Sequence, residues 1–168
     1  MTISQIDDNI QALVKSFQKE TFIYDFLTAF DFQKSTITLL KKGSRNLSKI
    51  AGEILVKKKF WFKELTKGEL EPVMKSIKAL PKIKNDPRFV ILTDYNKILA
   101  FDTKTKETLE TTIKQLTKDY AFFLPLAGME KTQYLDENPA DVKAAEKMAK
   151  LFDEIKKVNS FAPRLCLV

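Results

Sequence analysis

One segment, RFVILT at residues 88–93, constrains the fold more than any other because it is almost entirely apolar. A strand with one exposed face alternates apolar and polar residues, whereas a strand covered on both faces is apolar throughout. The segment therefore predicts a strand that is buried on both faces. Turn residues separate it from two further strand patterns, at residues 98–102 and 108–111, so a β-meander is expected.

Helical patterns surround this meander, with apolar residues recurring at spacings of three and four. Residues 53–63 predict two short strands or one bent strand. The fold class is therefore α/β in the broad sense (α+β), a mixed β-sheet flanked by helices. The helices before the last third of the chain are expected at residues 6–17, 21–30, 35–42, 68–80 and 113–120.

The C-terminal third predicts one more helix, and its start is clearly marked. Asn138 is a favourable N-cap, and Pro139 suits the first helical position, where a backbone N–H would have no partner. Asp141 adds a carboxylate near the helix N-terminus. The apolar stripe expected to dock on the core is Val142, Ala145, Ala149, Phe152 and Ile155.

Composition excludes several classes of protein. The 168 residues suit one domain, and the absence of histidine removes Ser-His-Asp and Cys-His catalysis and nearly every zinc site. A single cysteine, Cys166, excludes an internal disulfide and favours a reducing, cytoplasmic compartment. No apolar run approaches about 18 residues, so no membrane-spanning helix is expected. The early acids and the lack of an apolar core at the N-terminus argue against a signal peptide.

The net charge of +7 is unevenly distributed along the chain. Residues 34–84 hold 14 Lys or Arg and 4 Asp or Glu, a local net charge of +10, so the rest of the chain carries −3. Such segregation indicates a polyanionic partner, while a solvated lysine-rich surface is the alternative. The residues expected to contact nucleic acid are Lys41, Lys42, Arg45, Lys49, Lys57, Lys58 and Lys59.

Five long phrases between residues 22 and 157 resemble the N-terminal domain of MmeI-like DNA methyltransferases, the single-chain restriction–modification type. They are FIYDFLTAFDFQKSTITLLKKG, NLSKIAGEILVKKKFWFKEL, RFVILTDYNKILAFDTKTKE, FFLPLAGMEK and ENPADVKAAEKMAKLFDEI. The resemblance implies one N-terminal domain over residues 1–158. In the family a helical spacer and an adenine methyltransferase domain follow, whereas residues 159–168 form an atypical tail here, as expected of a natural truncation or a frameshift product.

In active family members this domain resembles a PD-(D/E)xK nuclease, whose acids bind Mg²⁺ and position a water. Where the family has those acids, this chain has Lys57, Lys58 and Lys59, so the resemblance implies a degenerate, inactive nuclease-like domain. A formal D…DxK match survives at Asp94, Asp102 and Lys104. The catalytic interpretation of these residues competes with a structural one, because Asp also initiates turns.

Methyltransferase motifs are missing: there are only four glycines, no Gly-rich cofactor loop and no Asn-Pro-Pro-Tyr motif. We therefore expect no cofactor in this chain, because S-adenosylmethionine would belong to the downstream domain, and no methyltransferase or nuclease activity from the chain alone. Three functions stay open. The domain contacts double-stranded DNA weakly and nonspecifically or docks to a methyltransferase domain or subunit; it is a Mg²⁺-dependent endonuclease; or it is a protein-interaction module without DNA binding.

Overall fold

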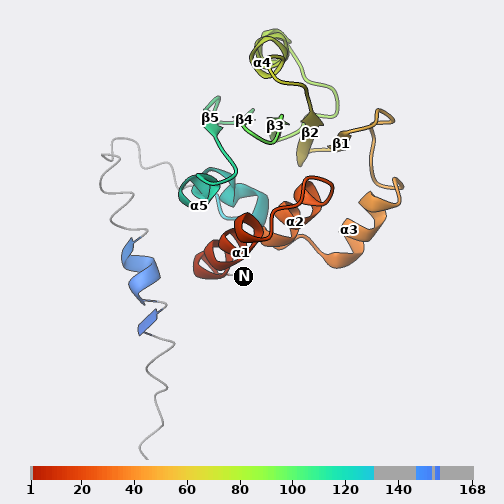
Figure 1. Ribbon diagram of the computed structural model, residues 1–168. Coiled ribbons are helices and arrows are strands. Elements are labelled where there is room, and N and C mark those ends of the chain that lie inside the picture. The colour runs from red at the N-terminus through yellow and green to blue at the C-terminus, as the bar shows by residue number, and fades with distance from the viewer. Residues whose placement is uncertain (1, 131–146, 153, 156–168) are drawn as a thin grey trace, which may run out of the picture.

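The central strand predicted from its apolar run is β3 (Phe89–Thr93), and all five of its residues are buried. The computed structural model describes residues 2–130, 147–152 and 154–155. It contains a five-stranded sheet with helices on both faces (Figure 1), as the sequence predicted. The strands are β1 (Glu53–Val56), β2 (Phe60–Glu64), β3, β4 (Ile98–Asp102) and β5 (Thr108–Thr111).

The strands lie in chain order across the sheet, and three of the four neighbouring pairs are antiparallel hairpins. The exception is the pair β2 and β3, which is parallel. A parallel pair needs a crossover, and α4 (Leu70–Ala79) supplies it. Residues 53–63 therefore form two strands and a tight hairpin, one of the two alternatives that the sequence left open.

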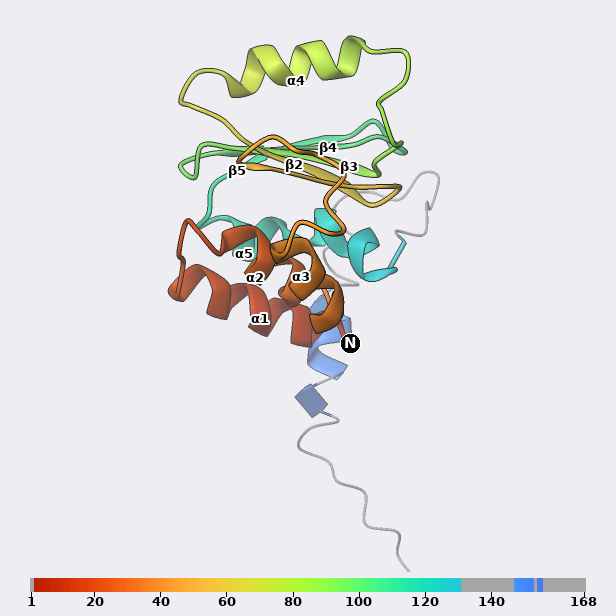
Figure 2. The same ribbon diagram turned by 90° about the vertical axis from the view of Figure 1, so that its right-hand side faces the viewer.

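Helices form a layer on each side of the sheet (Figure 2). α4 covers one face by itself, with Leu70, Met74 and Ile77 buried against the sheet. The other face carries the remaining elements near the sheet, which are α1 (Ile3–Lys15), α2 (Phe22–Ala29), α3 (Lys34–Lys41), α5 (Leu116–Asp119) and the 3₁₀ helix η1 (Tyr120–Ala127).

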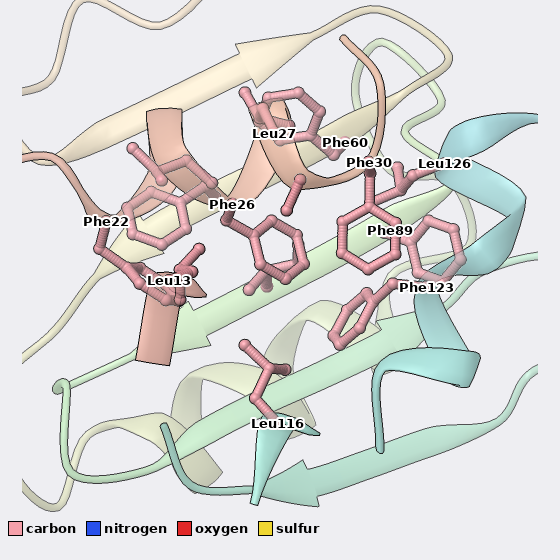
Figure 3. Close-up of a cluster of buried hydrophobic side chains, with 14 of the residues drawn as sticks. Leu13, Phe22, Phe26, Leu27, Phe30, Phe60, Phe89, Leu116, Phe123 and Leu126 are labelled. Carbon is pink, nitrogen blue, oxygen red and sulfur yellow. The ribbon is translucent and has the colours of Figure 1, made fainter. Parts of the chain in front are cut away.

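Alternation along β3 explains why it is apolar throughout. Phe89 and Ile91 belong to the core shared with α1, α2 and η1, while Val90 and Leu92 belong to the core under α4. The first of these cores is the larger and is rich in aromatic rings (Figure 3). The ring of Phe123 lies 5.1 Å from that of Phe26 and 5.8 Å from that of Phe89, so η1, α2 and the sheet meet at one aromatic contact.

Two helix starts differ most from the predictions. α1 begins at Ile3 rather than residue 6, because Thr2 and Gln5 form a capping box: Gln5 N–H donates to Thr2 Oγ1 at 3.2 Å, and Thr2 N–H donates to Gln5 Oε1 at 2.8 Å. The helix expected at residues 113–120 is α-helical only over Leu116–Asp119 and then continues as η1. Gly128, at φ +81°, ends η1 in the left-handed conformation that glycine adopts most readily.

The helix predicted to begin at Asn138 lies largely outside the described residues. Residues 147–152 are helical, and Lys150 Nζ lies 2.9 Å from the Asp7 carboxylate of α1. In these residues the prediction of a terminal helix near the domain is confirmed. Three members of the predicted docked stripe, Ala149, Phe152 and Ile155, lie in the described residues and are exposed, so they do not form a docked stripe there.

Candidate nucleic-acid interface

Three connections meet at one end of the sheet: the β1–β2 turn, the segment from α4 to β3, and the β4–β5 turn. Because β2 and β3 are parallel and β4 is antiparallel to β3, the start of β2, the start of β3 and the end of β4 lie side by side (Figure 2). Backbone groups join the connections: Lys58 N–H donates to the Asn85 carbonyl at 3.1 Å, and Thr103 N–H donates to the Arg88 carbonyl at 2.8 Å. Thr103 Oγ1 also donates to the Pro87 carbonyl at 2.8 Å. The three connections therefore present one continuous surface.

Seven lysines lie on these connections, and all are exposed. We call this set the basic end of the sheet: Lys57, Lys58, Lys59, Lys82, Lys84, Lys104 and Lys106. Among the described residues, only Lys104 of the seven forms an ion pair with an acid, Glu130. The basic end therefore concentrates unneutralised positive charge where a polyanion can reach it.

The backbone of the basic end has an unusual conformation. Lys58, Asn85, Asp86 and Lys106 all have positive φ values, between +52° and +64°. Residues other than glycine seldom adopt such values, and the surrounding structure must hold them there. The hydrogen bonds between the connections supply that support, so the lysines project from a defined backbone.

Arg88 lies at the centre of an ion-pair network within this surface. Its Nε donates to Asp102 Oδ1 at 2.8 Å, and its Nη2 donates to Asp102 Oδ2 at 3.0 Å. Glu130 accepts from Nη1 at 2.7 Å and from Nη2 at 3.2 Å, while Lys104 Nζ lies 3.3 Å from the same carboxylate. The hydrogen bonds to Asp102 and then to Glu130 raise the pKa of Arg88, and the bond from Arg88 lowers the pKa of Glu130.

The residues predicted to bind nucleic acid lie in different parts of the molecule. Lys57, Lys58 and Lys59 form the β1–β2 turn of the basic end. Leu47 N–H donates to the Leu55 carbonyl at 2.9 Å, so the segment carrying Arg45 runs beside β1.

The Arg45 side chain lies against α3, where its Nη1 donates to Thr36 Oγ1 at 3.3 Å. Lys49 lies near the start of β1, away from Lys57, because the adjacent Ser48 Oγ donates to Glu53 Oε1 at 2.9 Å. Lys41 and Lys42 end α3 in the helical layer, where Lys41 Nζ lies 5.1 Å from the centre of the Tyr24 ring. The predicted set is thus only partly gathered on one surface.

Three lysines of the basic end were not singled out from the sequence, namely Lys82, Lys84 and Lys106, and Lys104 was considered only as a catalytic candidate. A signal for them existed in the sequence, because each lies between two predicted helices or strands. Their proximity to Lys57, Lys58 and Lys59 depends on the parallel pairing of β2 with β3.

The structure does not bring the formal D…DxK residues together. Asp94 follows β3, whereas Asp102 ends β4, and the pairing of Phe89 with Asp102 places the two acids at opposite ends of the hairpin. Asp94 instead accepts from the backbone N–H groups of Asn96 and Lys97, at 3.0 and 2.8 Å, as a turn-initiating aspartate does. Within the described residues, no three His, Cys, Asp or Glu side chains are grouped as metal ligands would be.

The strands at which the resemblance would place a nuclease centre offer one buried acid. Glu53 pairs with Lys63 across β1 and β2, and Lys63 Nζ lies 3.9 Å from Glu53 Oε2. Glu53 also accepts from Ser48 Oγ, so its carboxylate is bound within the protein. These contacts have a structural role and do not resemble a pair of acids that binds a divalent ion.

The opposite end of the sheet has a different character. Two adjoining hollows of about 410 and 510 Å³ share Lys67, Asp94 and Asn96 in their walls. Lys97 Nζ, in the wall of the larger hollow, lies 3.0 Å from Glu71 and 2.8 Å from Glu110. Lys97 is thus neutralised by two nearby acids.

Comparison with known proteins identifies the family. Residues 1–158 match the family model described as MmeI, N-terminal domain. The chain belongs to this family. The resemblance of the five sequence phrases to the MmeI N-terminal domain is therefore confirmed.

The chain is also 39% identical over 161 residues to DNA methyltransferase A of Bacillus subtilis (strain 168). The match covers 95% of this chain and 18% of the relative, so the chain spans less than a fifth of the relative's length. No solved structure is significantly similar to the chain, and the nuclease-like ancestry of this MmeI N-terminal domain stays a prediction. No helix among the described residues is long and apolar enough to cross a membrane.

Proposed function

We propose that this chain is the non-catalytic N-terminal domain of a DNA-modifying protein and that its basic end contacts the phosphates of duplex DNA. Family membership supports the association with DNA modification. In this proposal the adenine methyltransferase chemistry and S-adenosylmethionine belong to other parts of such a protein, which acts in the cytoplasm.

One observation carries the DNA contact: six exposed lysines without an acid partner among the described residues lie on three connections that are hydrogen-bonded to one another. Lysine contacts to phosphate release counterions and supply affinity that does not depend on base sequence. The expected nonspecific dissociation constant at physiological salt is on the order of 10⁻⁴ to 10⁻⁶ M.

The proposal assigns no chemistry to Asp94, Asp102 or Lys104. The separation of the two aspartates supports this, since a PD-(D/E)xK centre needs its acids on one metal ion. The tests are that Mg²⁺ or Mn²⁺ should not support duplex cleavage by the purified chain and that S-adenosylmethionine should not support methylation. Metal-dependent cleavage that Asp94→Asn abolishes would restore the endonuclease interpretation.

The binding test compares two triple variants of equal charge. Changing Lys57, Lys58 and Lys59 to alanine should weaken binding to duplexes of unrelated sequence by the same factor and flatten the dependence of log K on log salt. Each lost phosphate contact reduces the slope by about 0.9. Fluorescence anisotropy over a salt series measures both effects.

The control variant changes Lys67, Lys114 and Lys118, which are exposed and lie away from the basic end. It removes the same net charge, so it should retain most of the affinity and the slope. Equal losses in both variants would show that net charge alone drives binding. No loss in either would leave the protein-interaction module as the better interpretation.

A further inference from the structure

The side chain of Glu130 is bound as an external oxyanion would be. Its two carboxylate oxygens face the two terminal nitrogens of Arg88, at 2.7 and 3.2 Å, and Lys104 Nζ adds a third contact at 3.3 Å. A guanidinium fork of this kind fits carboxylate and phosphate equally well, and a lysine beside it adds charge. Glu130, which occupies this position, has 52% of its side chain exposed and lies just beyond the C-terminal end of η1.

The cationic side of this site does not depend on Glu130 for its position. Asp102 is 4% exposed and holds Arg88 through Nε and Nη2, which fixes the plane of the guanidinium. Asp102 Oδ1 also accepts from the backbone N–H of Lys104 at 2.8 Å and so shapes the turn that carries Lys104. If Glu130 left, the guanidinium of Arg88 would keep its buried anchor, and the turn that carries Lys104 would keep its acceptor.

We propose that Arg88 and Lys104 form a phosphate site at the basic end, which Glu130 fills in the free protein and a backbone phosphate of duplex DNA fills in the complex. The inference rests on the proposed function and deepens it. No covalent step is involved, because one oxyanion replaces another on the same donors. The hydrogen bond from Arg88 lowers the pKa of Glu130, so a phosphate must compete with a charged carboxylate for these donors.

The position of the site on the surface adds to the argument. Thr103, next to Lys104, donates its backbone N–H to the carbonyl of Arg88 at 2.8 Å, so the site belongs to the hydrogen-bonded connections of the basic end. A duplex that contacts the unpaired lysines there would bring further phosphates to Arg88. Glu130 thus reduces the affinity of the free domain for polyanions.

The test is Glu130→Gln, which keeps the shape of the side chain and removes its charge. The variant should bind a short duplex more tightly and with a steeper salt dependence. One additional phosphate contact steepens the slope by about 0.9, which at about 0.1 M salt corresponds to roughly an eightfold gain in affinity. The circular-dichroism melting curve measures any change in stability separately.

Glu110→Gln is the matched control. Glu110 is 58% exposed and pairs with a lysine at 2.8 Å, but it lies at the opposite end of the sheet. Both variants raise the net charge by one, so a local site predicts a gain only for Glu130→Gln. Adding Lys104→Ala to Glu130→Gln should remove most of the gain.

The outcomes separate the two proposals. If the alanine triple at Lys57, Lys58 and Lys59 loses binding but Glu130→Gln matches Glu110→Gln, the phosphate site is wrong and the proposed function stands. If no variant binds duplex, the wild type included, both are wrong. A gain for inorganic phosphate without a gain for duplex would assign the site to free phosphate and overturn the DNA inference.

Discussion

The two ends of the sheet contain similar residue types and use them in opposite ways. At the basic end, lysines project from connections with few acids, and six of them have no acid partner among the described residues. At the opposite end, Lys97 lies between Glu71 and Glu110, and Lys19 pairs with Glu64 at 3.0 Å. The difference shows that the pairing of charges, more than their number, determines which surface attracts a polyanion.

The ends also differ in what anchors them. The Arg88–Asp102 pair lies largely out of water, with 16% and 4% of the side chains exposed. At the other end the ion pairs are exposed, and aromatic packing holds the β3–β4 turn: the ring of Tyr95 lies 6.0 Å from Phe22 and 6.1 Å from Phe17. Breaking the ion pairs should therefore lower the free energy of unfolding strongly at the basic end and very little at the opposite end.

The largest expected effect comes from Asp102→Ala. Removing one partner of a buried ion pair typically costs about 3–5 kcal/mol, and Arg88 would keep only the exposed Glu130 as its acid partner. The turn that carries Lys104 would also lose the acceptor for its backbone N–H. Urea denaturation measures the free energy of unfolding, and a loss below about 1 kcal/mol would show that this end is anchored in another way.

A smaller effect, dependent on pH, is expected from Tyr95 at the opposite end. Burial raises the pKa of Tyr95 above its ordinary value, and the nearby charge of Glu64 adds to the shift. The unfolded chain ionises this tyrosine from about pH 10, while the folded state keeps it protonated. Above that pH the unfolded state binds fewer protons, so stability should fall as the pH rises through and beyond about 10.

Tyr95→Phe checks this assignment. The variant loses the hydrogen bond to Glu64, which spans 3.3 Å, so a cost of about 0.5–1.5 kcal/mol is expected at neutral pH. It should also lose less stability than the wild type between about pH 9 and pH 11. Tyr24→Phe, on α2, is the control and should retain the full alkaline loss. Identical alkaline slopes for wild type and Tyr95→Phe would contradict the assignment.

The smallest effect is expected from Lys97→Ala. This change removes both ion pairs around Lys97, but exposed pairs contribute little to stability because water screens them. Binding to duplex should also stay nearly constant, because Lys97 is already neutralised by two acids. A destabilisation as large as that of Asp102→Ala would erase the distinction between the two ends.

Much of the fold follows from local patterns in the sequence. The apolar run of β3, the turn residues after it and the helical periodicity of α2 and α4 are each encoded within a dozen residues. They predicted the mixed sheet and its flanking helices. Helix boundaries were less predictable where side chains act across a turn, as the capping box of Thr2 does for α1.

The candidate site was harder to predict because its parts are distant in the chain. Arg88 and Glu130 are separated by 42 residues, and no local pattern links them. Lys82 and Lys84 join Lys57, Lys58 and Lys59 only because α4 returns the chain to a parallel position beside β2. The D…DxK spacing of Asp94 and Asp102 was a local match, and the antiparallel hairpin separates its members.

The crossover through α4 has a consequence for motion within the domain. Among the described residues, the core under α4 holds seven buried residues, whereas the core on the other face holds twenty-four. Local opening costs least where few apolar contacts are lost, so amide protons of α4 should exchange with solvent sooner than those of α2. The chain that leaves α4 carries Lys82 and Lys84, and each such opening would release these lysines from their neighbours in the β1–β2 turn. A duplex that contacts both segments would hold them together, and slower amide hydrogen exchange along α4 would show this.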